Sequence, residues 1–272
     1  MASSSSDHKE SWAAVREFMQ RTCGVVMAEE QKYLLEARLQ PVVKRFQLRS
    51  ITEAVQVART GPQASAVTAA VIDAMTTHET FFFRDDAFWR TLHEAVLPRL
   101  NAALGGTRRL RVWSAACSTG QEVYSLAMLL AEGWPALAER TELVGTDVSE
   151  LAVAKAREGV YNSIEVNRGL GAARLVKHFE GAEGGFRVKE ALRKRVSWQV
   201  HNLLQPGLDP VGCDLVLCRN VLIYFNEEDR KKVLRRLRCA AHPMGFIGVG
   251  STELIKGRQL AAGWYANSEL GE

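Results

Sequence analysis

Residues 110–131, LRVWSAACSTGQEVYSLAMLLA, decide the class of fold. An apolar stretch at 110–117 is followed by a polar turn at 118–122 and then by a helical run, which predicts a strand, a turn and a helix. Further strand-like stretches lie at 142–147, 196–200, 214–218 and 246–250. Strands that alternate with helices predict an α/β fold with a doubly wound parallel sheet.

The chain before residue 108 shows helical periodicity and no strand pattern, with Trp12, Val15 and Phe18 on one face of the first helix. Pro41 interrupts the second helical stretch and is expected to bend it or to mark its boundary. The stretch after residue 160 is rich in glycine and polar residues, with an arm that alternates like a hairpin, and it is expected to be an insertion. The expected parts are a disordered tail at 1–10, a helical domain at 11–76, a linker and interdomain segment at 77–107, an α/β domain at 108–272 and, within it, the insertion at about 161–195.

The composition is that of a globular protein, since 47% of the 272 residues are apolar and 24% are charged. Collagen-like, disordered and disulfide-scaffold proteins are therefore excluded. No apolar run approaches the roughly 18 residues of a membrane span, and the N-terminus lacks a signal-peptide pattern. The five cysteines form no C-x-x-C pair and no zinc spacing, which favours reduced thiols, a cytoplasmic location and no metal site. The net charge of +4 is too small to indicate nucleic acid.

The turn at 117–122 joins a strand to a helix N-terminus, where doubly wound sheets bind ligands. It lacks the glycine patterns that cradle a pyrophosphate, which disfavours nicotinamide dinucleotides and ATP. Asp147 closes the second strand, where its carboxylate could accept bonds from two ribose hydroxyls or cap a helix that begins near Ser149. A ribose site without a phosphate cradle points to S-adenosylmethionine.

Other polar residues are expected at the same crevice. The segment 77–85, THETFFFRD, lies between the two domains; it could be a hydrophobic hinge, or Thr80 and Arg84 could face the cleft, with Arg84 paired to a ligand carboxylate. Arg219 and Asn220 follow the strand at 214–217 and therefore lie on the ligand side of such a sheet. Asn202 also follows a strand, and Tyr224 could equally be a core residue.

Four segments resemble chemotaxis receptor methyltransferases of the CheR family, in order along the chain: 77–85, 112–122, 145–148 and 218–225. The resemblance runs from about residue 12 to about residue 255. It implies a class I S-adenosylmethionine-dependent methyltransferase fold with a small N-terminal helical domain and an inserted antiparallel β-subdomain. It also implies methyl transfer to glutamate side chains of methyl-accepting chemoreceptors, which gives glutamate methyl esters and S-adenosylhomocysteine.

The resemblance assigns roles residue by residue. The implied cofactor contacts are His78, Thr80, Arg84, Glu122, Asp147, Asn202, Leu203, Arg219 and Asn220. Tyr224 and Arg84 are the implied catalytic residues, and we expect Tyr224 to orient a reactant through its hydroxyl rather than to accept a proton. The chain departs from the family pattern at His78, where many relatives have Asn, and at 121–123, which reads Gln-Glu-Val where relatives often have Glu-Glu-Pro. The tail beyond residue 255 carries no assigned motif.

A run of cations in the helical domain is the expected docking face for acidic receptor helices: Arg38, Lys44, Arg45 and Arg49. No acid interrupts them between Glu36 and Glu53, although a solvated helix face would look the same. The six cations between Arg230 and Arg238 are expected to be such a solvated face. We expect a monomer without membrane insertion.

Three other functions are alternatives to a receptor glutamate methyltransferase. One is a non-catalytic, S-adenosylmethionine-binding regulator of a chemosensory pathway, against which the intact Asp147 and Arg219-Asn220 positions argue. The second is a nucleic-acid methyltransferase, but the Asn-Pro-Pro-Tyr type of motif is absent. The third, a nicotinamide oxidoreductase, lacks its glycine fingerprint.

Overall fold

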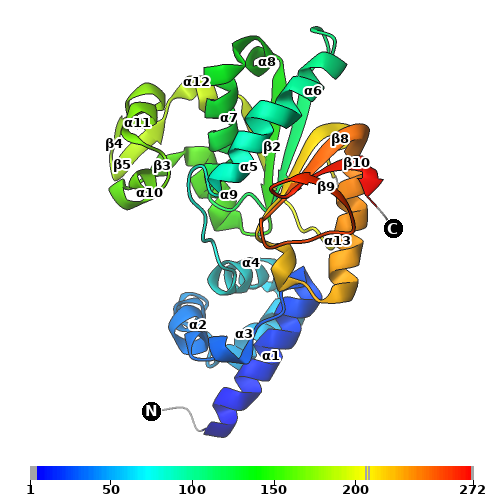
Figure 1. Cartoon of the computed structure of the whole chain (residues 1–272). Coiled ribbons are helices and arrows are strands. Elements are labelled where there is room, and N and C mark those ends of the chain that lie inside the picture. Colours follow the sequence, from blue (N-terminus) through cyan, green and yellow to red (C-terminus); the bar gives the residue numbers. More distant parts are fainter. Residues whose placement is uncertain (1–4, 206, 208, 271–272) are drawn as a thin grey trace.

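The computed structural model of the chain describes residues 5–205, 207 and 209–270. Its N-terminal part is all helical, as predicted, and lies apart from the sheet in Figure 1. The elements are α1 (Ser5–Cys23), the 3₁₀ turn η1 (Glu29–Gln31), α2 (Leu34–Arg45), α3 (Ile51–Thr60) and α4 (Ala64–Met75). Apolar side chains from all four α-helices form a separate core, among them Val15, Leu39, Val55 and Val71.

The start of α1 differs from the expected tail, and Pro41 does not mark the boundary of α2. The helix α1 begins at Ser5, so it takes in part of the expected tail at 1–10, of which residues 1–4 lie outside the described residues. A helix propagates readily from a packed segment, and Trp12 is the first buried residue of α1 that is described. The helix α2 continues through Pro41 to Arg45, because burial of Val42 and Val43 offsets the missing backbone hydrogen bond.

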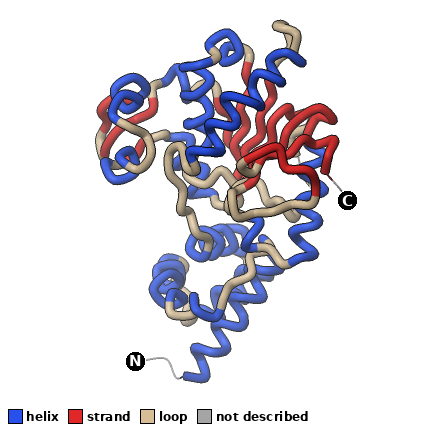
Figure 2. Tube along the Cα trace, in the orientation of Figure 1, coloured by secondary structure: helices blue, strands red, loops and turns tan. Residues whose placement is uncertain are grey.

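A seven-stranded sheet with the order β6-β2-β1-β7-β8-β10-β9 forms the second part of the molecule (Figure 2). Its strands are β1 (Leu110–Ala115), β2 (Thr141–Asp147), β6 (Val196–Val200), β7 (Cys213–Cys218), β8 (Ala241–Val249), β9 (Gly257–Ala261) and β10 (Trp264–Leu270). The first five in that order are parallel, and β10 runs antiparallel to both of its neighbours. The predicted doubly wound α/β fold is therefore confirmed, with an antiparallel edge.

Helices cover both faces of the sheet, as a buried parallel sheet requires. Leu215 and Leu217 belong to the core under α7 (Gln121–Gly133), whereas Val216 between them belongs to the core under α13 (Glu227–Ala240). The sheet layers also include α8 (Pro135–Glu139) and α9 (Glu150–Glu158). No helix in the described part of the chain combines the length and the apolar character that a membrane crossing needs.

The segment 77–107 is more than the expected linker. Residues 86–103 are helical, as α5 (Asp86–Thr91), the π-helical η2 (Leu92–Val96) and α6 (Leu97–Ala103). They pack into the sheet core, where the Phe88 ring stacks on Trp264 with centroids 4.4 Å apart. Pro98 hides this helix from sequence reasoning, and the π turn that precedes it suits a residue without an N–H to donate.

The insertion folds as the expected antiparallel subdomain, a three-stranded sheet with the order β3-β5-β4. Its elements are β3 (Val160–Tyr161), α10 (Ser163–Asn167), α11 (Ala172–His178), β4 (Phe179–Ala182), β5 (Gly185–Val188) and α12 (Glu190–Arg193). Phe82 anchors it, because its buried ring makes edge contacts with Tyr161 at 5.1 Å and Phe179 at 5.6 Å between centroids.

Candidate functional site

A pocket lies between the helical domain and the carboxyl edge of the sheet. Every residue expected to contact a cofactor lines it, together with Tyr224: His78, Thr80, Arg84, Glu122, Asp147, Asn202, Leu203, Arg219 and Asn220. These residues come from five separate segments, so the fold gathers them. Four of the segments end or follow a strand or form the interdomain connection, which is the location that their sequence positions predicted.

The turns that line this pocket hold strained backbone. Ala116, Ser118 and Asn220 all have positive φ, at 62°, 51° and 59°, and all three line the pocket. Such conformations cost about 1–3 kcal/mol each in non-glycine residues and concentrate at ligand sites. Gly120 follows at φ 94°, where a Cβ would lie 2.8 Å from that of Ala156, so the turn after β1 requires glycine there.

Asp147 ends β2 and points its carboxylate at the same turn. One oxygen, Oδ2, accepts from the Ser118 N–H at 2.8 Å, and Oδ1 accepts from the Ser149 N–H at 3.0 Å. The cap of α9 is Ser149, whose Oγ accepts from the Ala152 N–H at 3.0 Å, so Asp147 is not the helix cap. Burial raises the pKa of Asp147, and the amide bonds oppose that shift. A carboxylate has about four lone-pair sites, so acceptor capacity remains for ligand hydroxyls.

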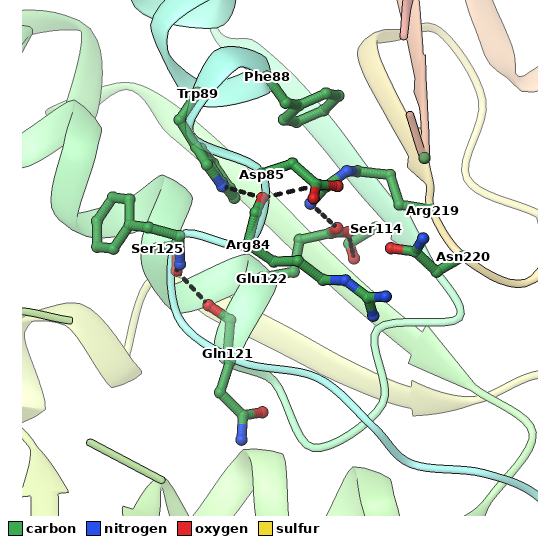
Figure 3. A network of polar contacts seen from close by, with 12 residues as sticks. Arg84, Asp85, Phe88, Trp89, Ser114, Gln121, Glu122, Ser125, Arg219 and Asn220 are labelled. Carbon is green, nitrogen blue, oxygen red and sulfur yellow. Dashed lines mark hydrogen bonds and ion pairs between the residues drawn. The ribbon is translucent and has the colours of Figure 1, made fainter. Parts of the chain in front are cut away.

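Arg219 forms the centre of a buried ion network (Figure 3). Its Nη1 lies 3.0 Å from Glu122 Oε2, and its Nη2 lies 2.7 Å from Asp85 Oδ2. The Arg219 guanidinium carbon lies 4.0 Å from the centre of the Phe88 ring. The second oxygen of Glu122 accepts from Ser114 Oγ at 2.8 Å. Arg219 and Glu122 therefore join the end of β7 to the start of α7 and hold segment 84–85 against both.

Arg84 stands outside those ion pairs, although its carbonyl accepts from Arg219 Nη2 at 2.8 Å. Its own guanidinium donates to the carbonyl of Glu79 at 3.1 Å and lines the pocket. Because that contact is to a neutral carbonyl, the Arg84 cation keeps donors for a ligand carboxylate.

A second set of contacts closes the pocket from the helical domain. The Val26 N–H donates to the carbonyl of Tyr224 at 2.7 Å, and the side-chain amide of Asn202 donates to the carbonyl of Thr22 at 2.6 Å. Tyr224 ends the short 3₁₀ turn η3 (Leu222–Tyr224) and is half-buried, so it is a pocket residue rather than a core residue. His78 Nε2 lies 3.1 Å from Thr76 Oγ1.

The thiols at this site are not nucleophiles. Cys23 and Cys117 both line the pocket and both are buried. Burial raises the pKa of Cys23 to about 11 and raises that of Cys117 well above its usual range, so both remain protonated near neutral pH. In the described ranges, no group of three or more His, Cys, Asp or Glu is placed to hold a metal ion.

The cations expected to dock a substrate lie outside the pocket: Arg38, Lys44 and Arg45 on α2, and Arg49 just after it. Arg38 is half-buried and donates to the carbonyl of Thr76 at 3.4 Å, next to the pocket lining, whereas the other three are exposed. On α13, the expected solvated face is only partly so, because Arg236 is half-buried against Asp209 at 2.8 Å.

Sequence reasoning missed three residues of this site: Asp85, Ser114 and Glu253. Asp85 and Ser114 lie inside segments already singled out, and their partners in the network identify them only once the fold is known. Glu253 is 2% exposed and accepts from three backbone N–H groups of the loops around the pocket. Its place four residues after the end of strand β8 was the one available signal.

Comparisons with a family model and with known proteins agree on one family. The family model described as "CheR methyltransferase, SAM binding domain" matches residues 78–266. Chemotaxis protein methyltransferase 1 of Pseudomonas aeruginosa is 38% identical over 245 residues, which cover 88% of this chain and 88% of that protein. Chemotaxis protein methyltransferase Cher2 of Pseudomonas putida is 35% identical over 247 residues, with 89% of each covered. Chemotaxis protein methyltransferase 1 of Vibrio cholerae is 34% identical over 244 residues, with 88% and 87% covered. Alignments of this length extend into the N-terminal helical part of the chain.

Proposed function

The chain belongs to the CheR family of S-adenosylmethionine-dependent methyltransferases, and on that premise we propose that it esterifies glutamate side chains of methyl-accepting chemoreceptors. The observation that carries the proposal is that Asp147, Arg84 and Tyr224 line one pocket. The first two suit the two polar ends of the methyl donor, and we assign Tyr224 to the acceptor carboxylate. A non-catalytic regulator is not favoured, since nothing in this set is lost.

The donor groups of the pocket fit S-adenosylmethionine. Asp147 keeps lone pairs for ribose hydroxyls, and Arg84, whose guanidinium donates to a neutral carbonyl, suits the carboxylate of the amino-acid end. Leu203 and Val148 add apolar surface for a base. When bound, the donor supplies a methyl group made electrophilic by its sulfonium.

The protein's own task is alignment. A free glutamate titrates at about 4.3, so the acceptor carboxylate is ionised near neutral pH and needs no general base. The opposing cost is removal of water from that carboxylate, which a fixed polar site offsets by offering oriented groups. We assign Tyr224 to orient the acceptor through its hydroxyl. The protonated thiols of Cys23 and Cys117 offer no competing nucleophile.

The substrate side of the proposal rests on charge. Lys44, Arg45 and Arg49 are exposed cations near the end of α2, in the domain that also lines the pocket. An acidic helix of a receptor would be attracted to this face, which raises the association rate more than it raises affinity. We propose that these three residues, with Arg38, guide receptor helices to the pocket, and that a monomer suffices for the reaction.

Transfer of a tritiated methyl group to receptor-bearing membranes tests the proposal. We expect label in the receptor and its release as methanol by mild base, because a carboxyl methyl ester is base-labile and an N-methyl group is not. Base-stable label would mean a different acceptor. Binding of S-adenosylhomocysteine without transfer to any receptor would instead support the regulator.

A further inference from the structure

A buried carboxylate outside the predicted site faces the loop that carries Arg219, Asn220 and Tyr224. Glu253 is 2% exposed, and it lies in the turn after β8, where its own N–H donates to the carbonyl of Gly250 at 2.9 Å. It does not line the pocket. Its negative charge contributes to the raised pKa of Cys218, at the end of the neighbouring strand β7.

All the hydrogen bonds that the structure gives to the Glu253 side chain come from backbone amides. Oε2 accepts from the N–H of Asn220 at 2.6 Å and from that of Gly250 at 2.8 Å. Oε1 accepts from the N–H of Leu222 at 2.7 Å. One side chain can serve three N–H groups only if both of its oxygens are acceptors, which is the property of a carboxylate and not of an amide.

These bonds fix the backbone at two decisive points. Asn220 has φ 59°, a conformation that its N–H bond to Glu253 helps to hold. Leu222 is the first residue of η3, the turn that ends at Tyr224. The carbonyl of Tyr224 accepts from Val26, so the loop is clamped by Glu253 on the sheet side and by the helical domain on the other.

The space around the carboxylate is closed. A Cβ built on Gly250 would lie 2.7 Å from Glu253 Oε2 and 2.8 Å from Asn220 Nδ2. Gly250 does not have positive φ, so its role is to leave room for these two side chains rather than to supply a special backbone angle. The glycine and the carboxylate therefore form one unit with the loop.

We propose that Glu253 is a positioning residue for methyl transfer, which sets the placement of the Tyr224 hydroxyl by bonding the backbone at 220 and 222. The inference rests on the proposed function, because the reaction gives Tyr224 its task. Glu253 touches neither donor nor acceptor. Its effect reaches the reaction through Tyr224, and that dependence distinguishes it from a residue that only stabilises the fold.

The test is a double-mutant cycle between Glu253→Gln and Tyr224→Phe, with kcat and KM for receptor methylation measured in each variant. The Gln side chain places an amide donor against backbone donors. We expect kcat of Glu253→Gln to fall roughly tenfold, as for one lost hydrogen bond to a charged group. In the Tyr224→Phe background, where the hydroxyl is absent, the same substitution should lower kcat by less than about twofold. If the fold-decrease in kcat of the double variant equals the product of the two single-variant decreases, the proposal is overturned.

Two further variants keep the test decisive. Glu269→Gln, an exposed acid of β10, removes a charge near the same end of the chain and should leave kcat unchanged. Gly250→Ala pushes on the same loop by the contacts given above and serves if Glu253→Gln fails to fold. It should show the same dependence on Tyr224, and independence from Tyr224 would contradict the inference. If the unaltered protein does not methylate receptors at all, the proposed function is contradicted instead.

Discussion

At the scale of single residues, the pocket depends on how each polar atom is divided between protein and ligand. The Asp147 carboxylate accepts hydrogen bonds from the amides of Ser118 and Ser149. The position was predictable from the end of a strand, but its alternative as a helix cap was not excluded until Ser149 proved to be the cap. The role of Glu253 could not be predicted from its place after a strand alone, because its partners are backbone groups that no side-chain pattern reveals.

Asp147→Asn should weaken S-adenosylhomocysteine binding roughly 10- to 100-fold. The amide is uncharged and has one acceptor oxygen, whereas the carboxylate is charged and has two. Calorimetric titration measures the change, and a thermal unfolding curve checks that the fold survives. Since burial raises the pKa of Asp147, binding by the unaltered protein should weaken as the pH falls through that raised pKa. Unchanged affinity in Asp147→Asn would remove this residue from the site.

Tyr224→Phe should slow methyl transfer by the same factor at every pH, since the hydroxyl orients a reactant and does not take up its proton. Removing one orienting hydrogen bond predicts a loss of roughly tenfold. A pH series of kcat, from about 6 to 9, spans the range in which a general base would be titrated. A defect confined to low pH, with the full rate restored above it, would assign Tyr224 a proton-transfer role instead.

At the scale of elements, burial determines what the sequence reveals. The strands β1, β2 and β7 were predicted close to their observed bounds because each is a short, largely buried run, and β6 because its first three residues alternate between buried and exposed. The hairpin of β9 and β10 was missed, since most of β9 is exposed and shows no alternation. Its turn has positive φ at Ala262 and Gly263, and only the glycine signals that in the sequence.

The helix α2 provides a prediction at this scale. Reversing Arg45 and Arg49 to Glu should lower kcat/KM for receptor methylation about tenfold or more at low ionic strength, and the defect should shrink as salt screens the charges. S-adenosylhomocysteine affinity should not change, because neither side chain lines the pocket. Both residues are exposed, and the ion pair of Arg49 with Glu53, at 3.7 Å, is a weak surface pair.

The matched control for α2 reverses Lys231 and Arg235 to Glu on α13. Both are exposed, so the change in net charge is the same while its location differs. An equal loss of methylation in this control would mean that overall charge, and not the face of α2, attracts the receptor. A loss of S-adenosylhomocysteine binding in the α2 variant would mean that those residues are structural.

At the scale of the whole molecule, the pocket exists because two separately packed parts meet. The helical domain has its own core, and the sheet has cores on both faces. Polar bonds join them around the pocket. One of these bonds joins two residues that do not line the pocket. Ser149 Oγ donates to Asp73 Oδ1 at 2.5 Å, which places an α4 carboxylate at the N-terminus of α9. A negative charge is favourable at a helix N-terminus, so this contact holds α4 against the sheet domain.

Asp73→Ala should therefore weaken S-adenosylhomocysteine binding without altering any residue that lines the pocket. If the domains separate part of the time, the apparent dissociation constant rises in inverse proportion to the closed fraction, and we expect a change of roughly two- to tenfold. Added S-adenosylhomocysteine should restore closure, seen as slower hydrogen exchange at 76–84 and at 217–224 together.

Asp86→Ala is the control, since Asp86 is exposed and its partner Arg90 lies on the same helix. Wild-type affinity in Asp73→Ala, with a lowered unfolding midpoint, would show that the pocket keeps its shape without this contact, and that closure of the two domains contributes nothing to binding.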